Sequence, residues 1–322
     1  MKYGILVTGG SGFIGQRVLQ ELQLRGVHPL MATVNKNGIK SLPGQPLELI
    51  ESSDMGRNLI TCLSRVAVVI HCAGVTKSTK VGAINTEATF REVNSTATLE
   101  LARQSALAGV RRFILVSSVK VNGESTPPDV PFCPDDVPAP ADAYASSKYQ
   151  AEQGLMELSY ETGMEFVVIR PPLVYGPGVK GNFASMTRWL IKGFPLPFGA
   201  VQNLRSLVAI DNLVDFIILC ADLQRAQRAA NEVFLVSDGE DVSTTDLLRK
   251  IAESYHVSPK LLPVSARCLR LIAKFLFKAK EADRLLGSLV VNSSKARTLL
   301  GWRPITSMDA QLAKMARYDK IS

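Results

Sequence analysis

Three glycines spaced three residues apart, Gly9, Gly12 and Gly15, constrain this chain more than any other feature. They follow an apolar run at residues 3–7 and open a segment of helical periodicity that starts near Phe13. Strand, turn and helix in this order, within about 30 residues, let a backbone approach a pyrophosphate without Cβ clashes. A helix N-terminus there offers N–H groups and the positive end of its dipole. The pattern predicts a dinucleotide-binding turn, with a merely flexible turn as the alternative.

Short β-branched runs alternate with helix-period segments from residue 3 to about residue 170. Two runs, 66–70 (VAVVI) and 113–116 (FILV), are apolar throughout, as strands covered on both faces must be. Such alternation favours an α/β fold with a parallel, doubly wound Rossmann sheet. The segments of this pattern are 3–8, 13–25, 28–34, 46–51, 58–63, 66–72, 86–108, 111–118, 144–161 and 165–170.

The character of the chain changes after Pro171 and Pro172, where loops become longer. We expect a dinucleotide-binding domain at 1–172 and a smaller C-terminal α/β substrate-binding part at 173–322. Helices are expected at 183–192 and 212–226, and the run 231–237 is a candidate for an extra strand of the first sheet. A loop at 126–140 contains six prolines in 15 residues and is predicted to have no regular structure.

The segment 261–280 (LLPVSARCLRLIAKFLFKAK) combines apolar and basic residues at helical spacing. We expect a helix with one core-facing side and one solvated side. A helix that lies on a membrane surface is the alternative.

Composition places the chain among ordinary globular proteins, since 46% of its 322 residues are hydrophobic and 20% are charged. No apolar run approaches the roughly 18 residues that a transmembrane helix needs. The N-terminus lacks the basic region and cleavage site of a signal peptide, so a cytoplasmic protein without a transmembrane segment is expected. The five cysteines show no C-x-x-C spacing and there are three histidines, which argues against a metal site and for buried thiols.

A net charge of +8 is compatible with nucleic acid, anionic lipid or a phosphate-bearing substrate. An ordinary basic surface is equally compatible. The sequence has neither a basic stripe interleaved with aromatics nor a helix-turn-helix signature, so no nucleic-acid partner is expected.

Tyr144 and Lys148 lie four residues apart, so on a helix both project from one face. A phenol has a pKa of about 10, and a lysine cation together with an oxidised nicotinamide would favour the phenolate. Ser118 ends a buried run 26 residues before Tyr144, where its hydroxyl could bind the same substrate oxygen. These residues predict an acid/base group that works near neutral pH. An exposed tyrosine–lysine pair is the alternative.

Together these motifs resemble the extended short-chain dehydrogenase/reductases, in particular the nucleotide-sugar epimerases, dehydratases and reductases. The resemblance covers nearly the whole chain and implies an NAD(P)-dependent enzyme with Ser118, Tyr144 and Lys148 as the catalytic triad. It implies that Asp54 contacts the adenine amino group and that Asn94 orders the active site. The cofactor-binding residues that it implies are Gly9, Gly12, Phe13, Ile14, Gly15, Asn35, Lys36, Asp54, Met55, Cys72, Ala73, Gly74, Asn94, Tyr144, Lys148 and Pro171.

The second half of the chain implies, by the same resemblance, a UDP-sugar substrate. Asn182 matches the position at which a UDP-sugar member holds its substrate. Arg205 and Arg284 resemble arginines that grip the diphosphate, for which a guanidinium has suitable bidentate geometry. A surface ion pair is the alternative for either arginine. With Ser118, these residues form the expected substrate-binding set.

The chain departs from the family pattern about 20 residues after the glycine turn. Asn35 and Lys36 stand where an NAD-binding member usually carries an acid for the ribose 2′-hydroxyl. Lys36 and Lys40 could instead accept a 2′-phosphate, so NADP(H) and NAD(H) both stay open. In a second departure, residues 117–124 (SSVKVNGE) differ from the form of the galactose epimerases. They look closer to a bacterial surface-polysaccharide branch that acts on UDP-N-acetylhexosamines, with 4-epimerases and 4-keto-6-deoxy-sugar 4-reductases.

The expected reaction is hydride transfer at C4 of a UDP-linked, N-acetylated hexose, in which Tyr144 moves the proton, Lys148 tunes it and Ser118 positions the oxygen. A 4-keto-sugar reductase is favoured over a 4-epimerase, because a reductase exchanges its nicotinamide at every turnover and the ribose acid is missing. A non-catalytic dinucleotide sensor is a further alternative, which the intact triad disfavours. The helices at 86–108 and 144–161 look like those through which the family forms homodimers.

Overall fold

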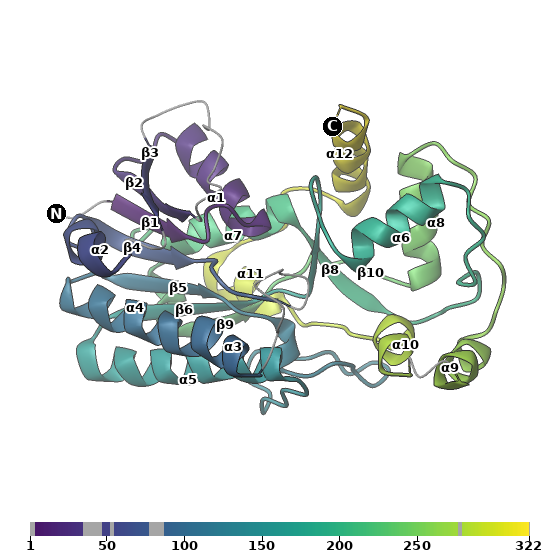
Figure 1. The fold of residues 1–322 in the computed structure, drawn as a ribbon, viewed down its shortest axis with the longest axis horizontal. Coiled ribbons are helices and arrows are strands. Elements are labelled where there is room, and N and C mark those ends of the chain that lie inside the picture. The colour runs from purple at the N-terminus through teal and green to yellow at the C-terminus, as the bar shows by residue number, and fades with distance from the viewer. Residues whose placement is uncertain (1–3, 35–46, 52–54, 77–86, 276–278, 322) are drawn as a thin grey trace.

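The computed structural model describes residues 4–34, 47–51, 55–76, 87–275 and 279–321. A large sheet flanked by helices forms the first part of the molecule, and a small sheet with its own helices forms the second (Figure 1). The strands of the large sheet are β1 (Gly4–Thr8), β2 (Leu30–Val34), β3 (Leu47–Glu51), β4 (Val66–His71), β5 (Arg112–Val116), β6 (Glu165–Arg170) and β9 (Glu232–Leu235).

All seven strands of the large sheet run parallel, in the order β3-β2-β1-β4-β5-β6-β9. Side chains alternate along β1: Val7 points into one hydrophobic core and Leu6 into the core on the opposite face. The first core is covered by α1 (Phe13–Leu24), α7 (Ile210–Ala221) and α11 (Ser294–Leu300). The other is covered by α2 (Met55–Leu63), α4 (Ala97–Leu107) and α5 (Ala143–Thr162). The expected doubly wound Rossmann sheet is therefore confirmed.

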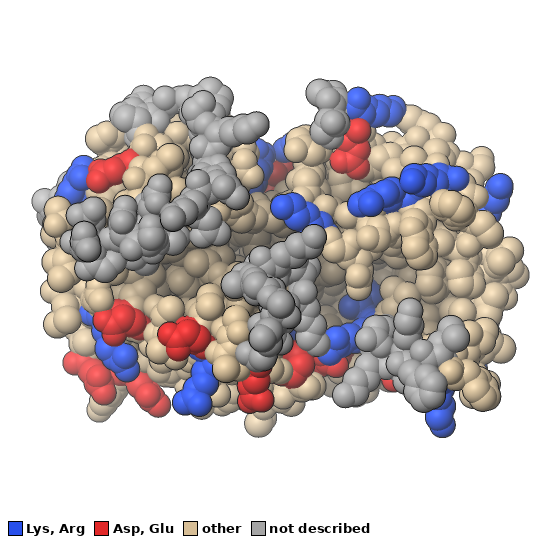
Figure 2. All heavy atoms as spheres, viewed as in Figure 1, with Lys and Arg blue, Asp and Glu red and all other residues tan. Residues whose placement is uncertain are grey.

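The second part contains the small sheet β10-β8-β7, built from β7 (Leu173–Tyr175), β8 (Arg205–Ala209) and β10 (Asp241–Val242). Its helices are α6 (Asn182–Ile191), α8 (Thr244–Ser254), α9 (Ala266–Phe275), α10 (Ala279–Leu286) and α12 (Met308–Ile321). A separate core joins α6, α8 and α12. On the face shown in Figure 2, Lys and Arg gather over this part, whereas Asp and Glu are prominent along the lower edge of the first part. A domain boundary at residue 172 remains a proposal.

The segment predicted as one helix over 86–108 is interrupted. α3 (Glu87–Arg91) leads into a π-helical turn at Glu92–Thr96 before α4 begins. Helical periodicity in a sequence does not distinguish the wider i→i+5 turn, which is why this feature was not predicted.

The helix predicted at 212–226 begins two residues early, at Ile210, and ends at Ala221. The carboxylate of Asp222 accepts hydrogen bonds from the backbone N–H groups of Gln224 and Arg225, both at 3.0 Å. This local turn competes with the helix and ends it.

The segment 261–280 does not form one core-facing helix. It contains α9 and the start of α10, and none of the residues of α9 is buried. The expectation of a core-facing side is therefore wrong for α9. No helix in the described ranges is long and apolar enough to cross a membrane.

Candidate active site

The glycine turn packs closely against the end of β4. Gly9 has a φ of +69°, and a Cβ added there would lie 2.7 Å from the backbone nitrogen of Ala73. A Cβ on Gly15 would lie 2.3 Å from the carbonyl oxygen of Gly9. Phe13 and Ile14 then begin α1, whose N-cap Gly12 has no side chain to occupy the first N–H groups. The turn therefore fits a pyrophosphate that approaches the backbone at the helix N-terminus.

Replacing Gly15 by Ala is expected to lower NAD affinity at least tenfold. The new methyl must displace the backbone at Gly9, and such overpacking costs roughly 1–3 kcal/mol. Isothermal titration with NAD measures the loss of affinity, and thermal unfolding measures the loss of stability. Ser11→Ala is the control, because Ser11 is exposed in the same turn. Wild-type affinity in Gly15→Ala would contradict the assignment of the turn to the pyrophosphate.

A buried histidine ties the glycine strand to the helix that carries Asn94. The Thr98 hydroxyl donates to the Asn94 carbonyl at 2.9 Å, so it accepts from Nε2–H of His71, also 2.9 Å away. Nδ1 of His71 then accepts from the Thr8 hydroxyl at 2.7 Å. Burial, helped by the charge of Lys148, lowers the pKa of His71 to about 3. His71 is therefore neutral and holds a single tautomer.

Asn94 lies in the π-helical turn and is fully buried. Its Oδ1 accepts from the Val75 N–H at 2.8 Å, and its Nδ2 donates to the Val75 carbonyl at 3.1 Å and to Ser147 Oγ at 3.1 Å. The residue thus joins the segment after β4 to the helix of Tyr144 and Lys148. Cys72, Ala73 and Gly74 make up the start of that segment, and a Cβ on Gly74 would lie 3.1 Å from Lys148 Nζ.

The three expected catalytic residues come together at the carboxyl ends of β5 and β6. Ser118 caps the short 3₁₀ helix Val119–Val121 after β5, since its Oγ accepts from the Lys120 N–H at 3.3 Å, and its side chain lies near enough to the Tyr144 phenol to lower the pKa of that group. Lys148 lies one turn further along α5 and donates to the Val116 carbonyl at 3.2 Å. The ring of buried Phe90 meets the Tyr144 ring edge-on, with 6.1 Å between centroids. The N–H of Val119 donates to the Pro171 carbonyl at 3.0 Å, which places Pro171 beside Ser118.

Burial dominates the protonation of these groups. It raises the pKa of Tyr144 to about 12. The neighbouring Ser118 side chain lowers this pKa, and the negative charge of Asp142 raises it further, but burial has the largest effect. It lowers the pKa of Lys148 to about 8 and raises the pKa of the Cys72 thiol to about 12. The protein's own groups keep the phenol protonated at neutral pH. Burial thus outweighs the shift toward the phenolate that we expected, and an oxidised nicotinamide, when bound, would add positive charge in favour of the phenolate.

A buried ion pair between α5 and the end of β6 helps to position the expected catalytic residues. Arg170 at the end of β6 donates to Glu152 of α5, with 2.6 Å between Nη2 and Oε2. Glu152 is fully buried, and it also accepts a hydrogen bond from Ser117, the neighbour of Ser118. Arg170 extends the network to Asn122 Oδ1 at 3.0 Å. Sequence reasoning missed Ser117, Glu152 and Arg170 as positioning residues, although Glu152 follows Lys148 by one helical turn.

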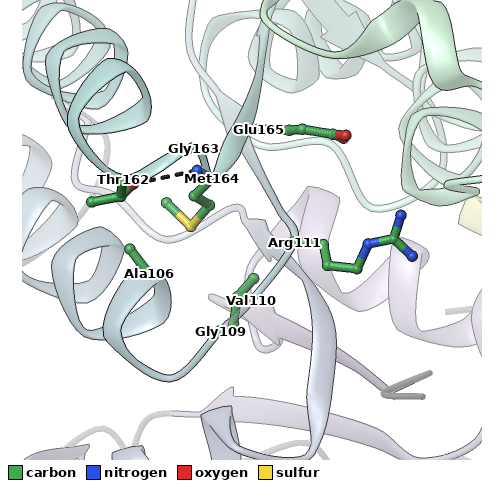
Figure 3. A pocket seen from close by; sticks show the side chains of 8 residues that line it. All are labelled: Ala106, Gly109, Val110, Arg111, Thr162, Gly163, Met164 and Glu165. Atoms are coloured by element: carbon green, nitrogen blue, oxygen red, sulfur yellow. Dashed lines mark hydrogen bonds between the residues drawn. The ribbon is translucent and has the colours of Figure 1, made fainter.

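A cavity of about 240 Å³ lies elsewhere, at the amino ends of β5 and β6 (Figure 3). It is lined by the turns that follow α4 and α5 and includes Arg111, Met164 and Glu165. The catalytic side chains lie at the opposite, carboxyl ends of these strands, where ligands bind in open α/β sheets. We therefore do not assign this cavity to the reaction.

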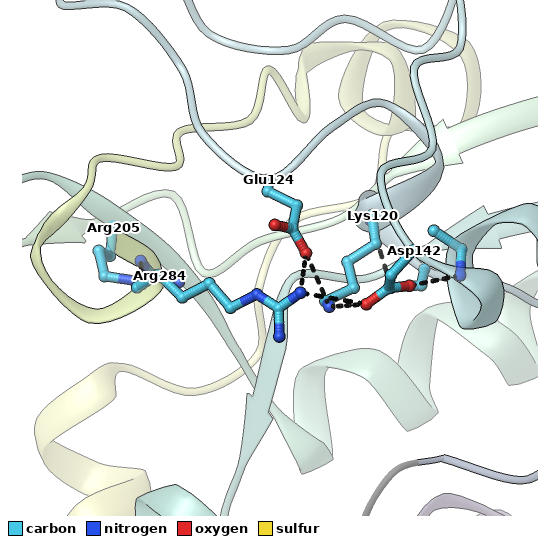
Figure 4. Close-up of polar contacts among 7 residues, drawn as sticks. Lys120, Glu124, Asp142, Arg205 and Arg284 are labelled. Carbon is cyan, nitrogen blue, oxygen red and sulfur yellow. Dashed lines mark hydrogen bonds and ion pairs between the residues drawn. The ribbon is translucent and has the colours of Figure 1, made fainter. Parts of the chain in front are cut away.

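The two expected diphosphate-binding arginines lie close together but make different contacts (Figure 4). Arg205 donates to the carbonyls of Arg284 and Gly287, at 2.6 and 3.1 Å. Arg284 pairs with Glu124 at 2.5 Å and with Asp142 at 3.3 Å. Asp142 also caps α5, since its Oδ1 accepts from the Ala145 N–H at 2.8 Å. Diphosphate binding by either arginine remains a prediction.

Lys120 completes this cluster, which the sequence had not indicated. Its Nζ lies 3.3 Å from Glu124 and 2.9 Å from Asp142. Lys120 and Arg284 therefore balance the two carboxylates, and the pKa of Glu124 is lowered by hydrogen bonds from both cations despite its burial.

The remaining predicted site residues are placed as follows. Asn182 begins α6 and is exposed. Met55 begins α2. Asn35, Lys36, Lys40 and Asp54 lie outside the described residues. Within the described ranges, no group of His, Cys, Asp and Glu side chains is arranged to hold a metal ion.

Comparison with known proteins gives a family match that spans the large sheet. Residues 5–236 match the model of the NAD dependent epimerase/dehydratase family. Over 305 residues the chain is 41% identical to a UDP-glucose 4-epimerase from Vibrio cholerae, an alignment that covers 94% of this chain and 92% of the relative.

Two solved structures share the fold over 99% of both chains. One is a UDP-glucose 4-epimerase from Thermotoga maritima with UDP-glucose, at 24% identity and a TM-score of 0.77. The other is a UDP-glucuronic acid 4-epimerase from Bacillus cereus in complex with NAD, at 21% identity and a TM-score of 0.80.

Proposed function

The chain belongs to the NAD-dependent epimerase/dehydratase family, and from this premise we propose that it catalyses hydride transfer at C4 of a UDP-linked hexose. It is thus an enzyme, and of the two cofactors left open by the sequence, NAD is the one on which its family depends. The convergence of Ser118, Tyr144 and Lys148 at the carboxyl ends of β5 and β6 carries the proposal.

The nicotinamide, when bound, supplies the hydride or accepts it. The turn at Gly9 and Gly15 holds the pyrophosphate, and the segment 72–74 lies along the cofactor beside Lys148. Tyr144 exchanges a proton with the oxygen on C4, and Ser118, whose side chain lies beside the same phenol, orients that oxygen. Lys148 supplies positive charge near the site. This division of roles is general acid–base catalysis by a positioned phenol.

Reduction of a 4-keto sugar is our first candidate. The raised pKa of Tyr144 supports it, because a protonated phenol is ready to give its proton to a developing C4 alkoxide. Residues 117–124 (SSVKVNGE) support an N-acetylated, 4-keto-6-deoxy substrate of the kind used in surface polysaccharides. Epimerisation at C4 is the second candidate, favoured by the 41% identity to a UDP-glucose 4-epimerase.

One experiment separates the two candidates. The purified protein is incubated with UDP-GlcNAc or UDP-glucose in the presence of NAD. In parallel it is incubated with a UDP-4-keto-6-deoxy-N-acetylhexosamine in the presence of NADH or NADPH. Stoichiometric consumption of NADH with the keto sugar supports reduction. A change of C4 configuration seen by NMR, without net cofactor consumption, supports epimerisation. Failure of the whole panel, with NAD bound normally, overturns C4 chemistry on these sugars.

The rate constant kcat/KM is expected to fall as pH rises through about 8. Lys148 is cationic below its lowered pKa and neutral above it, so the site loses its positive charge on the alkaline side. A pH profile of kcat/KM reports groups of the free enzyme. Lys148→Arg keeps its charge throughout, and its residual activity should show no such fall. If kcat/KM of the wild type and of Lys148→Arg fell with the same midpoint at alkaline pH, the fall would belong to a group other than Lys148.

We also propose a homodimer and a cytoplasmic location. Helices α4 and α5 pack side by side, and each carries an exposed large hydrophobic residue at or near its C-terminal end, Leu107 at 89% and Tyr160 at 94%. Sedimentation of the protein at micromolar concentration tests whether it is a dimer. A monomer would contradict the proposal.

A further inference from the structure

Helix α9 carries two parallel stripes of different chemistry. Cys268, Leu271, Ile272 and Phe275 recur at i, i+3, i+4 and i+7. The basic residues, Arg267, Arg270 and Lys274, recur at i, i+3 and i+7. Since an α-helix has about 3.6 residues per turn, each set forms a continuous stripe along the helix.

Both stripes of α9 face outward. Leu271 is 59% exposed, Ile272 is 52% exposed and Phe275 is 82% exposed. The partly covered residues, such as Leu269 and Ala273, lie on the other side of the helix. Figure 1 shows α9 beside α10 at the outer rim of the second part, far from the large sheet. Packing against the protein's own core therefore does not explain the apolar stripe.

The charge around α9 narrows the kind of partner. Arg270 makes one exposed pair, with Asp283 of α10 at 3.2 Å, and no acidic residue lies within α9 itself. The whole chain carries a net charge of +8. An apolar stripe flanked by a basic one complements a partner that has negatively charged groups at its surface and an apolar layer directly below them.

We propose that α9 docks the protein on the surface of an anionic lipid bilayer. The apolar stripe enters the boundary between headgroups and acyl chains, and the basic stripe meets the lipid phosphates. With 10 residues, or about 15 Å of length, α9 lies in the plane of the interface and does not span it. This surface is separate from the candidate active site, so the proposal does not rest on the proposed reaction.

Vesicle co-sedimentation of the full-length protein tests this proposal. Vesicles contain phosphatidylcholine alone or with about one third phosphatidylserine. Binding is expected to the anionic vesicles only, and it should weaken strongly between about 0.05 M and about 0.5 M NaCl, since salt screens exposed charges. Equal binding to both vesicles, or none to either, overturns the proposal.

Two sets of variants test the two stripes separately. Arg267→Gln, Arg270→Gln and Lys274→Gln together should weaken binding about 100-fold, at about fivefold for each charge near an anionic leaflet. Leu271→Ser with Phe275→Ser should weaken it at least tenfold. Leu24→Ser is the matched control, because Leu24 is a 79% exposed apolar residue at the end of α1 and should not affect binding.

Circular dichroism of each variant confirms that the fold is intact, and sedimentation velocity reports its oligomeric state. Stripe variants that bind vesicles like the wild type overturn the proposal. So does a loss of self-association without any change in vesicle binding, which would assign α9 to a protein interface.

Discussion

Tyr144→Phe is expected to lower kcat by about 10²- to 10⁴-fold, the usual contribution of a positioned acid or base. The substitution removes the hydroxyl that we propose exchanges a proton with the C4 oxygen, and it leaves the ring against Phe90. NAD affinity should stay within a factor of a few, because the glycine turn and Lys148 are untouched. Steady-state kinetics on the substrate identified by the panel and titration with NAD measure the two effects.

The control for Tyr144→Phe is Tyr160→Phe on the same helix. Tyr160 is 94% exposed and lies four turns beyond Tyr144 on α5. Tyr160→Phe keeps the aromatic ring on the proposed dimer face, so this variant should have wild-type turnover. Wild-type activity in Tyr144→Phe would revive the idea of a non-catalytic dinucleotide-binding protein that keeps the fold without using the triad.

Glu152→Gln is expected to destabilise the protein by about 3–5 kcal/mol, because it leaves the buried Arg170 guanidinium without a carboxylate. The loss is measured as a shift of the urea unfolding transition. Because Ser117 also donates to Glu152, the variant loosens the segment that holds Ser118, and kcat should fall as well.

An exposed ion pair provides the control for Glu152→Gln. Glu100 and Arg103 on α4 have side chains that are 57% and 62% exposed. Glu100→Gln should change stability by at most about 1 kcal/mol. Equal effects of the two substitutions would show that the Glu152–Arg170 pair contributes little beyond a surface contact.

Local patterns were sufficient to predict the first half of the fold. The apolar runs predicted the central strands, and the glycine spacing predicted the turn after β1, because both depend on residues close together in the chain. The proximity of Ser118, Tyr144 and Lys148 could also be predicted, since Tyr144 and Lys148 share one helix face and Ser118 follows the end of a strand; their catalytic roles stay a prediction.

The rest depended on contacts between distant residues. Glu152 and Arg170 are 18 positions apart, and Arg284 meets Glu124 across 160 positions, so no local pattern relates them. The amphipathic pattern of α9 has the same form whether its apolar stripe meets a core or solvent. Only the tertiary structure shows that the side chains of Leu271 and Phe275 are exposed to solvent.

The position of Asn94 depends on the one additional residue in the π-helical turn at Glu92–Thr96. A π turn accommodates one residue more than a regular α-helix over the same span. Deleting one residue there would restore regular hydrogen bonding and keep α3 and α4 in nearly the same orientation, yet it would shift the residues of the turn itself and withdraw Asn94 from Val75 and Ser147. The helix would become more regular while the contacts of Asn94 were lost, so the irregular hydrogen bonding of this turn is part of what positions Asn94.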